Sequence, residues 1–285
     1  MRPGEAPFTE RTPRVAAARA LLRRQGRERA GRFLAEGPQA VGEAVGWARD
    51  RGGGLLELFV TERAGTRHHE LVDAAVTVGA RVSPVTERAS AGLSDTATPQ
   101  GLVAVCSALP VPASRAAAGT RLVAVLAGVA EPGNAGTVIR VADAAGADAV
   151  ILAGHSVDPH NGKCVRASVG SVFHLPLAVE PDGRRAVDAC RDAGLHVLAA
   201  DGATGRDLDE AACAGVLDRP TAWLFGSEAH GLGPELLDAA DAAVAVPLHG
   251  RAESLNLATA AAVCLYASAR AHRSRPAATW PEPIA

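Results

Sequence analysis

The stretch LVAVLAGVAEPGNAGTVIRVADAA, residues 122–145, decides the fold class of this chain. Its first part, 122–129, is almost entirely apolar, whereas 135–145 carries its apolar residues at the spacing of a helix. A strand that is apolar on both faces is typical of a parallel sheet that helices cover from both sides. Residues 122–145 therefore predict a strand, a turn and a helix of an α/β fold.

The same alternation continues toward the end of the chain. Further strands are predicted at 149–153, 196–200, 222–225 and 243–248. Further helices are predicted at 184–193, 234–239 and 254–271. We therefore predict an α/β domain with a parallel sheet over 121–272, and a loose tail over 273–285.

A smaller α/β domain is predicted over 14–106, after a flexible N-terminus at 1–13. Its predicted helices lie at 17–25, 39–51 and 70–78, and its predicted strands at 55–60, 81–84 and 102–106. Residues 107–120, SALPVPASRAAAGT, are rich in Pro, Ala, Ser and Gly and show no periodicity. This composition favours a linker between the two domains.

Composition excludes several classes of protein. The 285 residues are enough for two domains, and 48% are hydrophobic, so a sizeable core can form. No apolar run is long enough for a transmembrane helix, and the N-terminus does not resemble a secretory signal. The five cysteines are scattered and never spaced as CxxC, which favours reduced thiols over disulfides or zinc. We expect a cytoplasmic protein that needs no metal and no membrane.

Charge is distributed unevenly, although the net charge is only −2. Residues 1–32 contain nine arginines and three glutamates. A solvated helix face explains this cluster, and so does a footprint for a phosphate backbone. Lys163 is the single lysine of the chain, so the use of arginine alone does not separate the two explanations.

Polar residues follow three of the predicted strands, where an α/β sheet binds its ligands. The first turn and helix carry Asn134 and Arg140 and lack the GxGxxG pattern of dinucleotide-binding folds. Asn134 would cap its helix, and Arg140 would have to lose its water unless it faces a polar cleft. The second turn, GSEAHGLG at 226–233, lets a backbone approach a ligand closely. In the third, LHGRAESLN at 248–256, Ser254 can cap the helix that follows.

These three segments resemble the ordered motifs of the SpoU/TrmH family, in the SPOUT superfamily of RNA methyltransferases. The matching positions are Asn134-x-Gly136-x3-Arg140, Phe225-Gly226-x-Glu228-x2-Gly231-Leu232 and Val246-Pro247-Leu248-x5-Ser254-Leu255-Asn256. The run VRASVGS at 165–171 is similar to a further family segment. RFLAEG at 32–37 and TPQG at 98–101 resemble the family's ribosomal-protein-like RNA-binding domain, so the likeness covers about residues 14–272.

The resemblance implies an S-adenosylmethionine (AdoMet)-dependent enzyme that methylates a ribose 2′-hydroxyl of structured RNA. It implies a sheet domain with a deep trefoil knot, an N-terminal RNA-binding domain, and a homodimer. The implied AdoMet-binding residues are Ala200, Gly226, Val246, Leu248, Ser254 and Leu255. The implied catalytic residues are Asn134, Arg140, Glu228, Ser254 and Asn256.

Arginine is not deprotonated in proteins. We therefore expect Arg140 to hold the ribose or its 3′-phosphate and to lower the pKa of the hydroxyl, with Asn134 and Glu228 orienting the guanidinium. Contacts with RNA phosphates are expected from Arg23, Arg24, Arg32 and Arg166.

The N-terminal domain favours ribosomal RNA over tRNA as the substrate. A tRNA ribose methyltransferase and an antibiotic-resistance rRNA methyltransferase remain alternatives. A catalytically silent RNA-binding protein would predict damage to the motifs, which are intact. A nucleotide-binding oxidoreductase would need a phosphate loop that is missing.

Overall fold

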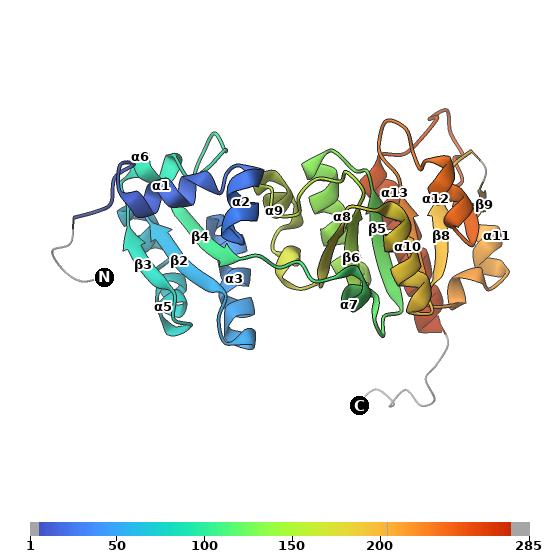
Figure 1. Ribbon diagram of the computed structural model, residues 1–285, viewed down its shortest axis with the longest axis horizontal. Helices are drawn as coiled ribbons and strands as arrows, with labels where there is room; N and C mark the ends of the chain where they lie inside the picture. The colour runs from blue at the N-terminus through green and yellow to red at the C-terminus, as the bar shows by residue number, and fades with distance from the viewer. Residues whose placement is uncertain (1–5, 204, 275–285) are drawn as a thin grey trace, which may run out of the picture. The chain divides into compact units, whose positions relative to one another are not determined.

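Strands and helices alternate along the computed structural model, which describes residues 6–203 and 205–274 (Figure 1). The chain divides into two compact units. The first contains residues 1–110, 135–140 and 158–174, and the second contains the remainder.

The first unit is built on a mixed four-stranded sheet in the order β1-β4-β2-β3. Its strands are β1 (Arg32–Glu36), β2 (Leu55–Val60), β3 (Arg81–Pro84) and β4 (Leu102–Ser107). Strand β4 is antiparallel to β1 and β2, and β3 is parallel to β2. The helices of residues 6–110 are α1 (Pro13–Ala20), α2 (Arg24–Ala30), α3 (Gly37–Arg51), α4 (Glu62–Arg67), α5 (His69–Thr77) and α6 (Glu87–Ala91).

Three predictions for this unit need correction. The helix predicted at 17–25 is two helices, because the chain leaves α1 after Ala20 and starts α2 at Arg24. Strand β1 was not predicted as a strand, although Phe33, Leu34 and Ala35 are buried. Residues 6–12 are not a free arm, since Phe8 pairs with Val85 and its N–H donates to the Pro84 carbonyl at 2.8 Å. Residues 1–5 lie outside the described residues.

The second unit confirms the predicted parallel sheet. Its seven strands have the order β7-β6-β5-β10-β8-β11-β9, and every pairing is parallel. The strands are β5 (Leu122–Ala127), β6 (Ala149–Ala153), β7 (Leu177–Glu180), β8 (His196–Ala200), β9 (Arg206–Asp207), β10 (Thr221–Phe225) and β11 (Ala242–Ala245). Strands β7 and β9 were not predicted, because four and two residues carry too little pattern.

Helices follow the strands as an α/β fold requires (Figure 1). They are α7 (Ala113–Ala117), α8 (Pro132–Ala145), α9 (Gly162–Ser168), α10 (Gly183–Asp192), α11 (Leu208–Cys213), α12 (Pro234–Ala239) and α13 (Leu257–Ser274), with short 3-10 turns η1 (Ser171–Phe173) and η2 (Val216–Asp218). Helix α7 lies inside the predicted linker at 107–120, so that segment is partly structured. Helix α9, η1 and residues 135–140 of α8 belong to the first unit.

Helices cover both faces of the seven-stranded sheet. Side chains of α7 and α10 pack with Val123, Val125 and Leu224 on one face. Alternate residues of a strand point to opposite faces, so Trp223 lies on the other face. There its indole N–H donates to the Ser268 hydroxyl of α13 at 2.9 Å, which satisfies a fully buried donor. Because every pairing is parallel, the carboxyl ends of the strands lie at one edge of the sheet.

Candidate functional site

A cavity of about 720 Å³ lies beyond the carboxyl ends of β8, β10 and β11. That position is where parallel α/β sheets bind ligands, and the volume suits a small organic molecule. The structure brings together on its wall all of the residues predicted to bind the cofactor: Ala200, Gly226, Val246, Leu248, Ser254 and Leu255. Glu228 and Asn256 line the same cavity.

The turn at Gly226 has no room for a side chain. Ser227 and Gly231 exchange backbone hydrogen bonds of 3.1 and 2.9 Å, which closes the turn over Gly226. A Cβ atom on Gly226 would come within 2.1 Å of the Gly231 carbonyl carbon and 2.4 Å of the Leu232 nitrogen. Glycine is required here because the backbone of Gly231 and Leu232 lies against it within a turn that lines the cavity.

The lining of the cavity fits a cation with an apolar part. Leu248 and Leu255 remain 41% and 36% exposed, which leaves apolar surface against which a purine ring can pack. The charged lining residues are Asp201, Glu228 and Glu253, and no Lys, Arg or His of the described residues lines the cavity. AdoMet carries a sulfonium and an ammonium against one carboxylate, so its net charge is attracted by this wall.

A directed chain of hydrogen bonds connects the three predicted motifs. The Asn256 side-chain oxygen accepts from the backbone N–H groups of Ala258 and Thr259, at 2.9 and 3.4 Å. Its Nδ2 therefore faces outward and donates to Asn134 Oδ1 at 3.2 Å. Asn134 Nδ2 in turn donates to Glu228 Oε1 at 2.8 Å. The backbone amides fix the orientation of both asparagines, and Glu228 receives the last hydrogen bond.

Two local predictions about these residues are wrong. Asn256, not Ser254, caps α13, which begins at Leu257; Ser254 lies exposed in the preceding loop. Asn134 does not cap α8, which begins at Pro132 with Glu131 as its cap. Asn134 lies in the first turn of the helix instead, and its side chain is free to reach Glu228.

Arg140 is exposed, so its guanidinium keeps its water. Six residues along α8 correspond to about 240° of rotation beyond one full turn and a rise of about 9 Å, so Arg140 and Asn134 leave the helix in different directions. Within the described residues, Arg140 has no hydrogen bond or ion pair with Asn134 or Glu228. The two side chains predicted to orient its guanidinium bond to each other instead.

The four arginines expected to bind RNA differ in their surroundings. Arg23 and Arg32 are exposed, and Arg24 pairs with Glu28 at 2.8 Å on the surface of α2. Arg166 forms ion pairs with Asp95 and, at 3.5 Å, with Glu36. Its charge is therefore already balanced within the first unit.

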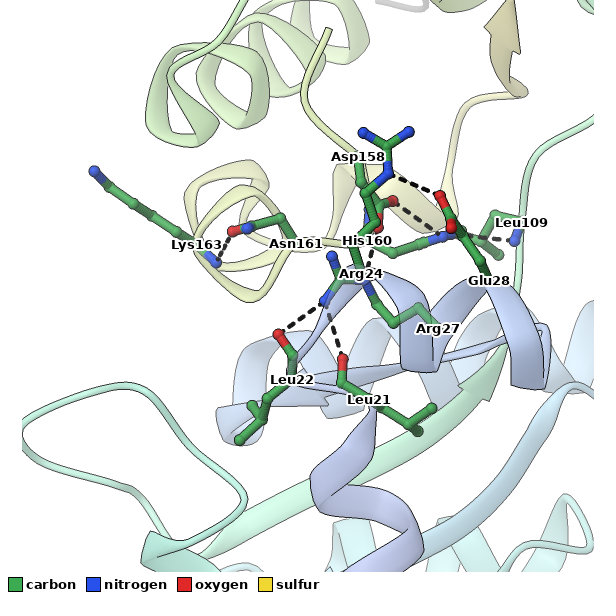
Figure 2. Close-up of polar contacts among 10 residues, drawn as sticks. All are labelled: Leu21, Leu22, Arg24, Arg27, Glu28, Leu109, Asp158, His160, Asn161 and Lys163. Atoms are coloured by element: carbon green, nitrogen blue, oxygen red, sulfur yellow. Dashed lines mark hydrogen bonds and ion pairs between the residues drawn. The ribbon is translucent and has the colours of Figure 1, made fainter. Parts of the chain in front are cut away.

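A buried ion pair joins α2 to residues 158–160 within the first unit (Figure 2). Arg27 is 5% exposed, and its Nε donates to Asp158 Oδ2 at 2.7 Å. Its Nη1 donates to the carbonyls of Leu21 and Leu22, both at 3.0 Å. Arg27 thus donates to two carbonyls at the junction of α1 and α2 as well as to Asp158.

His160 completes this cluster as a neutral side chain. Its ring stacks on Phe33 at 4.3 Å, and its Nε2 accepts from the Leu109 N–H at 3.2 Å. Burial lowers the pKa of His160 from 6.5 to about 4, against the opposing effect of Asp158. The backbone N–H of His160 donates to Asp158 Oδ1 at 2.8 Å, so both carboxylate oxygens are engaged.

The sequence did not single out every residue of the cavity. Asp201 and Glu253 line it but were not predicted. Asp201 directly follows β8, and a carboxylate at the end of a parallel strand was a usable signal. Within the described residues, no group of His, Cys, Asp and Glu is arranged to hold a metal ion. All five cysteines are free, and no helix in the described part of the chain could cross a membrane.

Two family models match this chain. The SpoU rRNA Methylase family matches residues 121–266, and an MRM3-like substrate binding domain matches residues 12–104.

One curated relative is the 23S rRNA (guanosine(2553)-2'-O)-methyltransferase RlmP of Bacillus subtilis (strain 168). It is 34% identical over 237 residues, which are 82% of this chain and 87% of the relative. An AdoMet-bound rRNA methyltransferase from Sinorhizobium meliloti has a TM-score of 0.76 and 32% identity, over 91% of this chain and 95% of that one. The SpoU methyltransferase AviRb from Streptomyces viridochromogenes, in complex with AdoMet, has a TM-score of 0.79 and 30% identity, over 93% and 100%.

The family match covers the whole seven-stranded sheet and the loops that form the cavity. The solved structures extend the likeness to more than nine tenths of the chain. This chain belongs to the SpoU rRNA methylase family.

Proposed function

We propose that this protein transfers a methyl group from AdoMet to a ribose 2′-hydroxyl of ribosomal RNA, with 23S rRNA as the substrate. The observation that carries this proposal is the acidic cavity. Its wall includes Glu228 and Asn256, which hydrogen bonds through Asn134 connect. The relative RlmP is named for 2′-O-methylation of 23S rRNA, which favours ribosomal RNA over tRNA.

AdoMet supplies an activated methyl group, so the protein needs to hold and align the reactants more than to activate the donor. The backbone at Gly226, Val246 and Leu248 would grip the cofactor, and Leu255 would pack against its adenine. Asp201 and Glu253 would face its positive groups. The loops of three neighbouring strands thus contribute backbone, apolar surface and charge.

The hydrogen bonds from Asn256 to Asn134 and from Asn134 to Glu228 hold Glu228 in place as an acceptor at the cavity. A residue held in this way loses little conformational entropy when the ribose arrives. Arg140 acts differently, because its exposed guanidinium can bind the ribose or its 3′-phosphate. Its positive charge would stabilise the ribose oxygen as that oxygen takes the methyl group from the sulfonium and its proton passes to water.

The remaining architecture is proposed on the same basis. Residues 14–106 would be the RNA-binding domain, supported by the match of 12–104 to a substrate-binding model. The C-terminal part would form a trefoil knot, as the resemblance to the SpoU/TrmH family implies. A homodimer is supported by Val263 and Tyr266, which leave apolar surface of α13 exposed at 39% and 52%.

The helical spacing of Leu257, Ala261, Cys264 and Leu265 would make that stripe a candidate dimer contact, but it is not the exposed surface. Ala261, Cys264 and Leu265 of α13 are 0% exposed and pack inside their own unit. Val263 and Tyr266 lie on the outer side of the helix and are the better candidates.

Methyl transfer from tritiated AdoMet to protein-free 23S rRNA, 16S rRNA and total tRNA tests the proposal. We expect label on 23S rRNA, and loss of transfer in Arg140→Ala with unchanged AdoMet affinity by isothermal titration. The matched control is Arg115→Ala, which removes an exposed arginine from α7. Label on tRNA alone would exclude the ribosomal substrate, and normal turnover by Arg140→Ala would exclude the role of Arg140.

A further inference from the structure

Arginines in the first unit fall into two groups. Five of them already pair with carboxylates: Arg14, Arg24, Arg27, Arg88 and Arg166. Arg63 and Arg67 are exposed on α4 and have no carboxylate partner among the described residues. They are four residues apart in the helix and so lie on the same side of it. Their charges remain available to a ligand.

Both arginines line a cavity of about 290 Å³ in the first unit. His68 is the third ionisable residue of its wall, and no carboxylate of the described residues lines it. A wall with guanidinium groups and no acid favours an anion, although the whole chain has a net charge of −2. Phosphate groups match the donor geometry of arginine.

A second cavity of about 390 Å³ continues from the first, since Pro38, Thr98 and Gln100 line both. Its wall adds Gln39, Thr96, Glu36 and Arg166. The Glu36 carboxylate is already engaged, since it pairs with Arg166 at 3.5 Å and accepts from the Thr96 hydroxyl at 3.1 Å. The Gln39 amide donates to Glu43 at 3.3 Å, which leaves its carbonyl oxygen as an acceptor. Amides and hydroxyls both donate and accept hydrogen bonds, as the edges of nucleotide bases require. We call the two cavities together the α4 groove.

Two glycines allow the chain to pack closely beside the α4 groove. A Cβ atom on Gly37, which has a φ of +87°, would come within 2.8 Å of Gln100 Oε1. A Cβ atom on Gly101, with a φ of +78°, would come within 2.5 Å of Thr61 Oγ1. These two turns contain the segments 32–37 and 98–101 that the sequence singled out, so their glycines allow the turns to pack closely beside the groove.

Val169 lines the second cavity of the groove. Its φ of +52° is strained for a β-branched residue, and its side chain is 38% exposed. Backbone strain of this kind concentrates at ligand sites. An apolar side chain held open at the edge of a polar groove can pack against a base or a sugar.

We propose that the α4 groove binds an unpaired strand of the RNA substrate, with Arg63 and Arg67 on phosphates and the amides of Gln39 and Gln100 on base edges. This inference rests on the proposed function and deepens it. An unpaired strand fits better than a duplex, because amides reach base edges that pairing would hide. It also assigns phosphate binding to arginines other than Arg166, whose charge Glu36 and Asp95 already balance.

The experiment measures the affinity of the full-length protein for protein-free 23S rRNA by filter binding at several KCl concentrations. The double variant Arg63→Ala/Arg67→Ala should reduce the slope of log affinity against log salt by about 1.4, because each lost phosphate contact to a single strand contributes about 0.7. The matched control is Arg49→Ala/Arg81→Ala, which removes the same charge from two exposed arginines outside the groove. The control should keep the wild-type slope.

A second variant, Val169→Gly, separates binding from folding. Glycine relieves the positive φ, so the melting temperature should stay or rise. Affinity for the RNA should fall several-fold if Val169 packs against a nucleotide. Unchanged RNA affinity in both groove variants would overturn the proposal, as would an equal loss of slope in the control.

A failure of the groove proposal can be distinguished from a failure of the proposed function. Each variant is also assayed for methyl transfer and for AdoMet affinity. If the wild type methylates 23S rRNA while the groove variants bind and respond to salt normally, only the groove proposal fails. If the wild type transfers no methyl group to any RNA, the proposed function fails first. A higher KM for RNA with unchanged kcat in Arg63→Ala/Arg67→Ala supports both.

Discussion

Asp158→Asn tests the buried cluster of Figure 2. In the wild type, one carboxylate oxygen accepts from Arg27 Nε at 2.7 Å and the other from the His160 N–H at 2.8 Å. Asparagine keeps the shape but replaces one oxygen with an NH2 group. Either orientation of the amide then places a donor against a donor, at Arg27 or at the backbone of His160. The substitution therefore leaves Arg27 without its counter-charge in a position that is 5% exposed.

Removing one partner of a buried ion pair costs about 3–5 kcal/mol, because the remaining charge is not solvated. Asp158 is 14% exposed, so some water reaches the pair, and we expect a loss of about 3 kcal/mol in the free energy of unfolding. Arg24 and Glu28, drawn in the same figure, form a surface pair 60% and 61% exposed. Glu28→Gln should therefore cost at most about 0.5 kcal/mol.

Urea unfolding followed by circular dichroism measures these differences. Adding Arg27→Met to Asp158→Asn should recover part of the loss, because the double variant no longer buries an unpaired charge. The reasoning is refuted if Asp158→Asn lies within about 1 kcal/mol of the wild type, or if Glu28→Gln costs as much.

Three further changes test other parts of the molecule. The pKa of about 4 for His160 lies below its unfolded value of 6.5, so the unfolded chain takes up a proton first and the free energy of unfolding falls by about 3 kcal/mol as the pH drops from 6.5 to 4. His160→Gln should remove that part of the decline in melts at pH 7 and 4.5, and an unaltered pH dependence would contradict the assignment. Gly226→Ala forces a Cβ against Gly231 and should weaken AdoMet binding about tenfold in isothermal titration, because overpacking costs about 1–3 kcal/mol. Unchanged AdoMet affinity would exclude the backbone at Gly226 as part of the binding site. Tyr266→Arg should convert a particle of twice the chain mass into one of chain mass in sedimentation, and a variant that remains a dimer would place the interface elsewhere.

Much of the fold could be predicted because its signals are local. The strands of the parallel sheet are buried on both faces, and β5 is apolar at all six positions. Such runs need no knowledge of the tertiary structure. Strands β7 and β9 were missed for the opposite reason, since β9 has two residues and depends on its pairing with β11.

The candidate site was predicted in composition but not in geometry. Motif spacing identified Asn134, Glu228 and Asn256, whereas the direction of their hydrogen bonds depends on where α13 begins. The ion pair between Arg27 and Asp158 spans 131 residues, and no local pattern announces it. Long-range pairs of this kind decide which arginines remain without a carboxylate partner. The number of arginines in residues 1–32 therefore could not decide between a solvated helix face and a surface that binds a phosphate backbone.

The central claim is that the methyl group is placed on a ribose oxygen of 23S rRNA. A 2′-O-methyl group removes the hydroxyl that attacks the neighbouring phosphate in alkali, so a labelled 23S rRNA should yield a labelled, alkali-resistant dinucleotide. We predict that tritium from AdoMet is recovered in one such dinucleotide, and that Arg140→Ala abolishes it. Label recovered instead in single nucleotides, as a methylated base would give, would contradict the account.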